Sequence, residues 1–350
     1  MSLELVWFCL GALSLAAYVV LDGFDLGTGI LHFVAPATAR ERALSMKSIG
    51  PVWDGNEVWL LAAAATLYLA FPKLYATAIS GFYLPVTILI WLLAFRALGI
   101  EMKHHLHHPL WDEIWDVAFF GASTLITLFL GVALGNLVRG VSIDASGKFF
   151  APLWTNFAVG EEVGILDWFT LLVGLTATAS VALHGAIWLA HRVEGPVETR
   201  ARKLVAPLAI VTLLSLLLTS AGLVVVRPDL PASLALRPLV FLLPALALVG
   251  LGAALGLARR GDYRRAFLGS ATFLAAMVLT AAATIYPNVI VARIGERSIS
   301  ASAAKAGEYG LSVGLYWWIP GVLLAMSYFA FLYRKLPRAL RDADLDDHTD

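Results

Sequence analysis

The segment 3–31, LELVWFCLGALSLAAYVVLDGFDLGTGIL, is a nearly unbroken apolar run that carries two aspartates, Asp22 and Asp25, close to its end. Its length exceeds the roughly 20 apolar residues that a helix needs to span a bilayer. No basic region precedes the run and no small-residue cleavage site follows it, so we expect a retained transmembrane helix rather than a signal peptide. Carboxylates beside hydrocarbon are costly and commonly serve proton or ion movement, which makes both aspartates candidate functional residues.

The composition predicts an integral membrane protein. Apolar residues make up 59% of the 350 residues and charged residues 14%, against about 45–50% and about 25% in a soluble domain. The net charge of zero gives no indication of nucleic-acid binding. The single cysteine, Cys9, excludes an intrachain disulfide and cysteine-based metal motifs. Phosphate-binding loops, dinucleotide-binding motifs and nucleophile elbows are absent from the sequence.

The hydropathy pattern predicts nine membrane-spanning helices and an all-α fold. Backbone polar groups cannot stay unpaired in lipid, so each continuous apolar run should be helical. The weakest candidate is 239–258, which begins just after Arg237-Pro238 and contains Pro244. The predicted spans are 3–31, 53–71, 74–100, 115–138, 163–191, 204–226, 239–258, 266–292 and 311–333.

The distribution of Lys and Arg predicts the orientation. Counting Arg96 at the end of its span, 17 of the 25 Lys and Arg residues fall after the first, third, fifth and seventh spans or in the C-terminal tail. Positively charged loops prefer the cytoplasm. We therefore expect the N-terminus outside and the C-terminus in the cytoplasm.

This orientation predicts acids at three consecutive cytoplasmic helix ends. Asp22 lies about 27 Å along a helix from the start of the first span, near the inner boundary of a hydrocarbon layer about 30 Å thick. Asp22 and Asp25 share a helix face through their i,i+3 spacing, as do Asp54 and Glu57 at the start of the next span. Glu101 closes the third span on the same side. Together these acids favour a proton-handling function.

Structural alternatives exist for each acid taken alone. Asp54 has the residue type of a helix N-cap. Asp22 and Asp25 have the charge to pair with Arg96 or Lys103 across the surface.

The histidines argue against a haem ligated by this chain. Haem in a helical bundle needs axial ligands such as His or Met on facing helices. Only His184 falls well inside a predicted span, where a hydrogen-bonded core histidine is the simpler interpretation, and Met277 and Met326 are better explained as packing residues. The histidine-rich run 104–108 has the composition of a divalent-metal patch, although we expect it in a solvated cytoplasmic loop.

Two motifs resemble the signature of subunit II of the cytochrome bd-type quinol oxidases. They are DGFDLG at 22–27 and PVWDGNEVWL at 51–60. The resemblance runs from end to end and is strongest in the first 140 residues. Supporting matches are FP at 71–72, SGFY at 80–83, FR at 95–96, GVALGNL at 131–137 and HGA at 184–186.

The resemblance implies a subunit of an electrogenic complex of the aerobic respiratory chain, in the bacterial cytoplasmic (inner) membrane, that oxidises quinol and reduces oxygen to water. It implies a haem-bearing subunit I as partner, which holds haem b together with haem d or a third haem b and forms the quinol site. It allows for a quinone held in this chain and for a small single-helix accessory subunit. It further implies a first four-helix bundle (1–140), a second (160–292), a peripheral helix (311–333) and a cytoplasmic tail (334–350).

The resemblance also implies roles for individual residues. The acids near a cytoplasmic proton route are matched by Asp22, Asp25, Asp54 and Glu101. Glu57 stands where some members have Gln and adds an acid to that pattern. A tryptophan near a hydrophobic oxygen channel is matched by Trp59.

Two other function classes compete with this interpretation. A proton-coupled secondary transporter would use the acids as coupling sites, but transporters tend to place binding acids on broken helices near the bilayer midplane. A purely structural assembly subunit would use the acids as helix caps.

Overall fold

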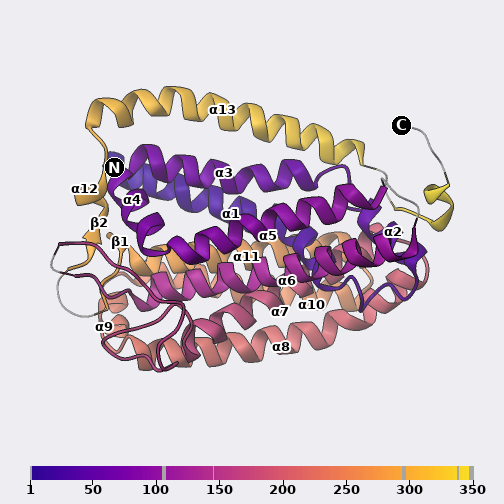
Figure 1. The fold of residues 1–350 in the computed structure, drawn as a ribbon, viewed down its shortest axis with the longest axis horizontal. Coiled ribbons are helices and arrows are strands. Elements are labelled where there is room, and N and C mark those ends of the chain that lie inside the picture. Colours follow the sequence, from indigo (N-terminus) through magenta and orange to yellow (C-terminus); the bar gives the residue numbers. More distant parts are fainter. Residues whose placement is uncertain (1, 105–107, 145, 294–296, 337–338, 347–350) are drawn as a thin grey trace.

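The computed structural model describes residues 2–104, 108–144, 146–293, 297–336 and 339–346. Its long helices run side by side along one axis (Figure 1). The first helix, α1 (Leu3–Ile30), begins at the end that carries the short strands. The last described helix, η3 (Asp342–Leu345), packs against α2 (Ala39–Lys47) at the opposite end. The chain thus starts at one end of the bundle and finishes at the other, as an odd number of spans requires.

The described chain consists of helices and one small two-stranded sheet. The other α-helices are α3 (Trp53–Ala70), α4 (Pro72–Gly81), α5 (Tyr83–Glu101), α6 (Pro109–Arg139), α7 (Trp168–Arg192), α8 (Pro196–Val226), α9 (Leu230–Ala235), α10 (Leu242–Arg259), α11 (Tyr263–Ile285), α12 (Ala301–Ala304) and α13 (Glu308–Lys335). The other 3-10 helices are η1 (Met102–His104) and η2 (Pro238–Phe241). The strands β1 (Asn288–Ile290) and β2 (Ile299–Ser300) pair antiparallel.

The predicted all-α membrane fold is confirmed. In the described part of the chain, eight helices are long and apolar enough to cross a membrane, and α3 with α4 makes a ninth if this bent pair is one span. The prediction of 74–100 as one continuous helix is wrong, because α4 ends at Gly81 and α5 begins at Tyr83. Pro85 in the first turn of α5 has no N–H to donate to the Gly81 carbonyl, and Ala151 N donates to that carbonyl instead, at 3.1 Å.

Other differences from the predicted elements have local causes. The fifth span begins at Trp168 rather than at 163 because the Asp167 carboxylate caps α7, accepting from Phe169 N and Thr170 N at 2.9 Å each. The eighth span ends at Ile285 rather than at 292, because the apolar residues after Pro287 form β1 instead of a further helical turn. The short helix α2, which begins with a capping box at Thr38, is not predicted because it lies outside the apolar runs.

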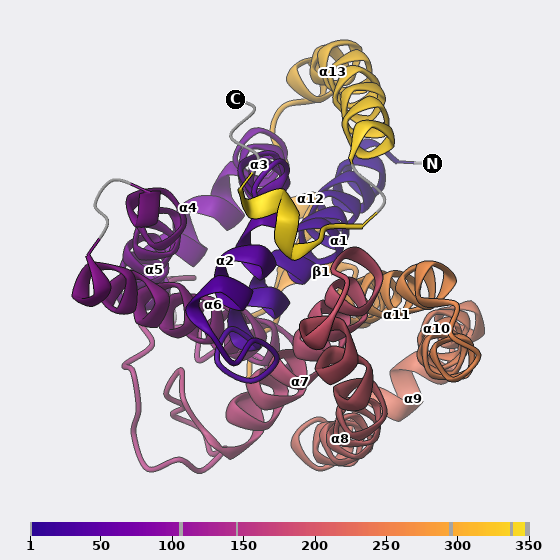
Figure 2. The same cartoon turned by 90° about the vertical axis from the view of Figure 1, so that its right-hand side faces the viewer.

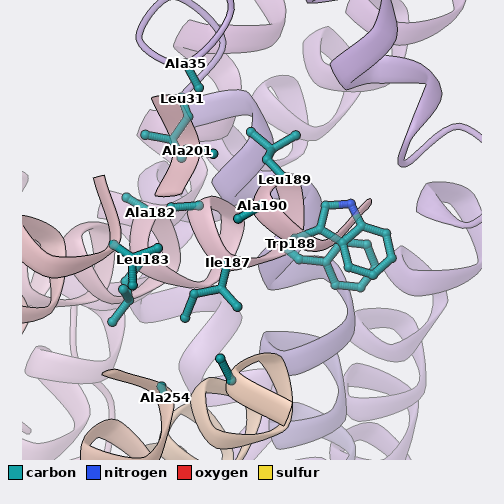
Figure 3. Close-up of a cluster of buried hydrophobic side chains, with 14 of the residues drawn as sticks. Leu31, Ala35, Ala182, Leu183, Ile187, Trp188, Leu189, Ala190, Ala201 and Ala254 are labelled. Atoms are coloured by element: carbon teal, nitrogen blue, oxygen red, sulfur yellow. The ribbon is translucent and has the colours of Figure 1, made fainter. Parts of the chain in front are cut away.

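The centre of the bundle is formed by α1, α6, α7 and α11, which pack against one another. The approach of α1 to α7 is so close that a Cβ on Gly27 would clash with the Val181 carbonyl oxygen. Beside this contact, the Trp188 ring stacks on Phe24 with ring centroids 3.9 Å apart. Figure 3 shows the buried apolar cluster around Trp188, to which α7 contributes most of the labelled side chains.

The last long helix, α13, lies apart from this centre. Seen along the bundle, α13 stands at the edge, next to α3 and α1 (Figure 2). Leu311 is the residue of α13 that is buried in the fold. The assignment of 311–333 as a peripheral helix stays a prediction, which this position supports. The division of the remainder into two four-helix bundles stays a prediction, since α1 packs on α3 and also on α7 and α11.

Candidate functional site

Asp22 and Arg96 form a buried ion pair between α1 and α5. Both side chains have no exposed surface. Arg96 Nη1 donates to Asp22 Oδ2 at 2.8 Å, and Nη2 donates to Asp22 Oδ1. The two parallel contacts make a bidentate pair, a strong geometry for a guanidinium and a carboxylate. The alternative of an Asp22–Arg96 pair is therefore correct, although the pair is buried and does not cross the surface.

Two further carboxyl groups face the same guanidinium. Asp25 Oδ2 lies 4.0 Å from Arg96 Nη2, and Glu57 Oε2 lies 3.8 Å from Arg96 Nη1. Asp25 is fully buried, whereas the Glu57 side chain keeps 23% of its surface exposed. We call Asp22, Asp25, Glu57 and Arg96 the carboxyl cluster. It joins α1, α3 and α5 around the positive charge of Arg96.

Asp25 has a neutral hydrogen-bond donor as a close partner. Asn56 Nδ2 donates to Asp25 Oδ2 at 2.7 Å, and Tyr333 OH on α13 donates to Asn56 Oδ1 at 2.8 Å. Asp25 Oδ1 has no hydrogen-bond partner among the described residues. Neither Asn56 nor Tyr333 is singled out by the sequence. The second motif contains Asn56, but only the fold brings Tyr333 to it.

The other two predicted acids lie outside this buried cluster. Asp54 is exposed in the first turn of α3, one turn before Glu57. The alternative that Asp54 is the N-cap is wrong, because Val52 occupies the N-cap position and its side chain makes no capping hydrogen bond. Glu101 is the last residue of α5 and is exposed. The structure thus brings together Asp22, Asp25 and Glu57 and leaves Asp54 and Glu101 at helix ends.

Trp59 lies further along α3 than the carboxyl cluster. Its side chain is buried and packs against Phe329 of α13, with ring centroids 5.9 Å apart. The indole N–H has no hydrogen-bond partner among the described residues. Trp59 therefore contributes an aromatic, apolar contact between α3 and α13.

A second buried cluster, which is not predicted from the sequence, surrounds Asp116 on α6. His32 Nε2 lies 2.8 Å from Asp116 Oδ1, Arg42 Nε donates to Asp116 Oδ2 at 2.7 Å, and Lys103 Nζ donates to Asp116 Oδ1. We call these four residues the Asp116 cluster. The alternative that Lys103 pairs with an aspartate of α1 is wrong, because Lys103 pairs with Asp116. Burial of the imidazole lowers the pKa of His32 below its ordinary value.

His184 is a hydrogen-bonded core histidine, as predicted. Its Nε2 lies 3.1 Å from Val20 O and its Nδ1 lies 2.7 Å from Ser270 Oγ. Both ring nitrogens therefore join α7 to α1 and α11. Among the described residues no group of three or more His, Cys, Asp or Glu side chains could hold a metal ion. Residues 105–107 of the histidine-rich run lie outside the described residues.

Comparisons with known proteins agree on one family. A model of the family described as cytochrome bd terminal oxidase subunit II matches residues 3–336. The probable cytochrome oxidase subunit 2 of Haemophilus influenzae is 30% identical over 362 residues, which cover 95% of this chain and 94% of that protein. The cytochrome bd-I ubiquinol oxidase subunit 2 of Escherichia coli is 28% identical over 375 residues, which cover 99% of this chain and 97% of that protein.

A solved structure supports the fold independently. The bd oxidase from Geobacillus thermodenitrificans contains a chain that superposes with a TM-score of 0.75 at 19% identity, covering 95% of this chain and 98% of that chain. At this identity the similarity shows the fold alone. Taken with the family model, which spans nearly the whole sequence, it leads to one conclusion: the chain belongs to the family of cytochrome bd terminal oxidase subunit II.

Proposed function

We propose that this chain is the subunit that carries protons, but no haem, in a quinol oxidase of the bacterial inner membrane. The relative from Escherichia coli is a ubiquinol oxidase subunit, which supports quinol as the substrate class of the complex. Quinol oxidation releases electrons, and reducing oxygen to water consumes electrons and protons. The haems of subunit I, haem b with haem d or a third haem b, would supply the electron transfer and oxygen chemistry. The occupied ring nitrogens of His184 support their location in that partner.

The observation that carries the proton role is the charge balance of the carboxyl cluster. Asp22, Asp25 and Glu57 face the guanidinium of Arg96. Unpaired negative charge is costly in a buried site, so a cluster of three acids and one base has reason to hold a proton. Such a cluster can take up a proton on one side and release it on the other as its charge changes. A purely structural role would need no such excess of acid.

The proposed route begins at the exposed acids and ends at the buried ones. Asp54 and Glu101 would collect protons from the cytoplasm, and Glu57, partly exposed one turn from Asp54, would pass them to Asp25 and Asp22. This order follows the exposure of the side chains, from the exposed Asp54 to the fully buried Asp25. It requires the predicted orientation, with the N-terminus outside and the C-terminus in the cytoplasm.

Replacing Asp25 by Asn in the assembled complex tests the proton role. The variant keeps the side chain's size and can still accept a hydrogen bond, but it cannot exchange a proton. Turnover with quinol should fall on the order of 10²-fold, the lower end of what a positioned proton-transfer group contributes. Unchanged turnover in a complex with full haem content would reject the proposal.

Oxygen access beside Trp59 is a second, separate part of the proposal. The apolar contact of Trp59 with Phe329 supports it, because oxygen is an apolar molecule and prefers apolar surroundings. A Trp59→Ala variant should change the apparent KM for oxygen and leave the pH dependence of turnover as it is. An unchanged KM for oxygen would reject this part alone.

The partner proposal has its own test. The complex isolated through this chain in mild detergent should show haem absorption bands in a reduced-minus-oxidised spectrum, together with a second large membrane subunit. The red part of that spectrum would distinguish haem d from a third haem b, and gel analysis would reveal a small accessory subunit. A haem-free single polypeptide would reject the proposal.

A quinone held in this chain is a further part of the proposal. An apolar cavity of about 140 Å³ between α1, α6, α7, α8 and α11 is the candidate place for its ring. Quinone extracted from the purified complex and measured by mass spectrometry should decrease in Ala177→Leu, which places a larger side chain at the wall of this cavity. Undiminished quinone in that variant would reject this location.

The transporter alternative has lost its support. The family model that matches residues 3–336 describes a subunit of a terminal oxidase, which favours the oxidase interpretation of the acids over their use as coupling sites of a transporter.

A further inference from the structure

The peripheral helix α13 reaches the carboxyl cluster through a hydroxyl group. Much of the helix presents large apolar side chains outward, such as Trp317 and Leu324. Toward its end, however, the Phe329 ring lies against Gly55 of α3. One turn later, Tyr333 OH donates to Asn56 Oδ1 at 2.8 Å. A helix at the edge of the fold thus donates a hydrogen bond to Asn56, the residue that donates to Asp25.

The Asn56 amide lies in one orientation between Tyr333 and Asp25. An amide side chain has one accepting end and one donating end. Tyr333 OH donates to the oxygen of Asn56, and the NH₂ group on the other end of the amide donates to Asp25 Oδ2 at 2.7 Å. The other oxygen of Asp25 has no hydrogen-bond partner among the described residues. If the amide rotated, Asp25 would therefore lose its close neutral donor.

Contacts on both sides hold Tyr333 in place. Its ring lies edge-on to Phe24 of α1, at 6.4 Å between centroids and an interplanar angle of 85°. The described segment after α13 pairs with the end of α7, where Leu340 N donates to Arg192 O and Glu194 N donates to Leu340 O, both at 2.8 Å. Leu340, seven residues after Tyr333 in the sequence, is thereby hydrogen-bonded to the end of α7.

Charged and titratable groups face Asp25 and its hydrogen-bonded neighbours from several helices. Asp22 is committed to its bidentate pair with Arg96. Arg96 cannot turn away without breaking this ion pair. Asn56, by contrast, is a donor to Asp25 whose orientation can change without breaking an ion pair. The groups are Asp22 on the same helix, Glu57 on α3, Arg96 on α5, Tyr333 on α13 and Arg192 on α7.

We propose that Tyr333 is a positioning residue for proton transfer: it fixes the Asn56 amide so that Asp25 keeps its hydrogen-bond donor. The proposal rests on the proton role of Asp25 proposed above. It makes α13 part of the proton-handling unit, although α13 carries none of the acids of the carboxyl cluster.

The test replaces Tyr333 by Phe in the complete two-subunit complex, with Tyr328→Phe as the matched control. Tyr328 lies on the same helix and is exposed, so its variant removes the same atom from a surface position of this chain. Tyr333→Phe should leave haem content and assembly unchanged and reduce turnover roughly two- to tenfold, the range that the net loss of one hydrogen bond produces. It should also displace the pH profile of turnover by about half a unit or more. Tyr328→Phe should leave both the turnover and its pH profile unchanged.

Infrared difference spectroscopy supplies a readout that does not depend on turnover. The carboxyl band of Asp25 is identified as the band that disappears in Asp25→Asn. Tyr333→Phe should shift this band, because the hydrogen bonding of the carboxyl group has changed. An unmoved band with an unmoved pH profile would overturn the proposal, whatever the turnover.

A double variant tests whether Tyr333 acts through Asn56. In an Asn56→Ala background, Tyr333→Phe should add no further change in pH profile or band position, because two residues on one path are not additive. An equally large effect in that background would overturn the proposed path. If Asp25→Asn leaves turnover unaffected, the proton function fails, and the shift of the Asp25 band still decides whether Tyr333 positions Asn56.

Discussion

The two buried ionic clusters have opposite balances of charge. In the carboxyl cluster three acids face one arginine, whereas in the Asp116 cluster one acid faces two cations and a histidine. Both join several segments of the chain, and both contain a fully or almost fully buried aspartate. The two clusters differ in the effect that an added proton would have on their charge balance. An added proton relieves an excess of negative charge in the first cluster, but in the second it would neutralise the carboxylate that holds the cations.

This contrast is the basis for the proposal that one buried cluster handles protons and the other stabilises the fold. The Asp116 cluster joins α6 to α2 and to the segments that follow α1 and α5, and its cations are already paired. Removing one partner from a buried ion pair of this kind lowers the stability of the fold strongly. We therefore expect changes in the Asp116 cluster to affect stability, and changes in the carboxyl cluster to affect proton transfer once the fold is preserved.

The largest effect is expected from Arg96→Leu. This change leaves three carboxyl groups around an apolar side chain and removes both donors to Asp22. Removing one partner of a buried ion pair costs about 3–5 kcal/mol, so the complex should assemble poorly or not at all. The yield and the Tm of the purified complex would measure this. Arg265→Leu, which breaks an exposed i,i+3 pair with Asp262, is the control and should leave both nearly unchanged.

A smaller effect with a different signature is expected from Asp116→Asn. The amide can still accept a hydrogen bond but no longer balances the two cations. Hydrogen bonds to charged groups contribute about 1.5–3 kcal/mol, so the free energy of unfolding should fall by an amount of that order, seen as a lower Tm. Turnover per assembled, haem-loaded complex should stay at the wild-type level. A large loss of turnover at normal Tm would contradict the proposed distinction between the clusters.

The pH dependence of stability offers a third, smaller effect, through His32. Burial lowers the pKa of His32 in the folded protein below its ordinary value of 6.5. Between these two values the unfolded chain binds more protons, so this histidine's contribution to stability is complete above the unfolded pKa and is lost as the pH falls toward the folded pKa. The Tm of wild type should therefore decrease more than that of His32→Asn between about pH 7.5 and about pH 5.5. Equal decreases would show that His32 is not the group responsible.

The sequence predicts the membrane fold well because hydropathy is a local property. The spans, the acids at their ends and the core role of His184 follow from short stretches of residues. The break at Phe82 is not predicted, because the group that takes the Gly81 carbonyl is Ala151, which lies far along the chain. Likewise, Asp116 stands inside a predicted span with nothing nearby in the sequence to indicate its partners.

The candidate site is predictable only in part, for the same reason. The motifs at 22–27 and 51–60 contain all three acids of the carboxyl cluster as well as Asn56, but they do not show that Arg96 lies among the acids. Tyr333 stands at the end of the ninth predicted span, where an aromatic residue is typical of a membrane interface. Its role depends on α13 lying beside α3, an arrangement that only the three-dimensional structure reveals (Figure 2).

The most direct test of the central claim is proton uptake by the complex in liposomes, followed with a pH-sensitive dye while quinol is oxidised. Asp25→Asn and Asp116→Asn would be compared with wild type at equal haem content. The charge balance of the two clusters predicts that Asp25→Asn slows proton uptake together with oxygen consumption, whereas Asp116→Asn leaves both at the wild-type rate. Wild-type proton uptake in Asp25→Asn, or a slowed uptake confined to Asp116→Asn, would contradict this assignment of function.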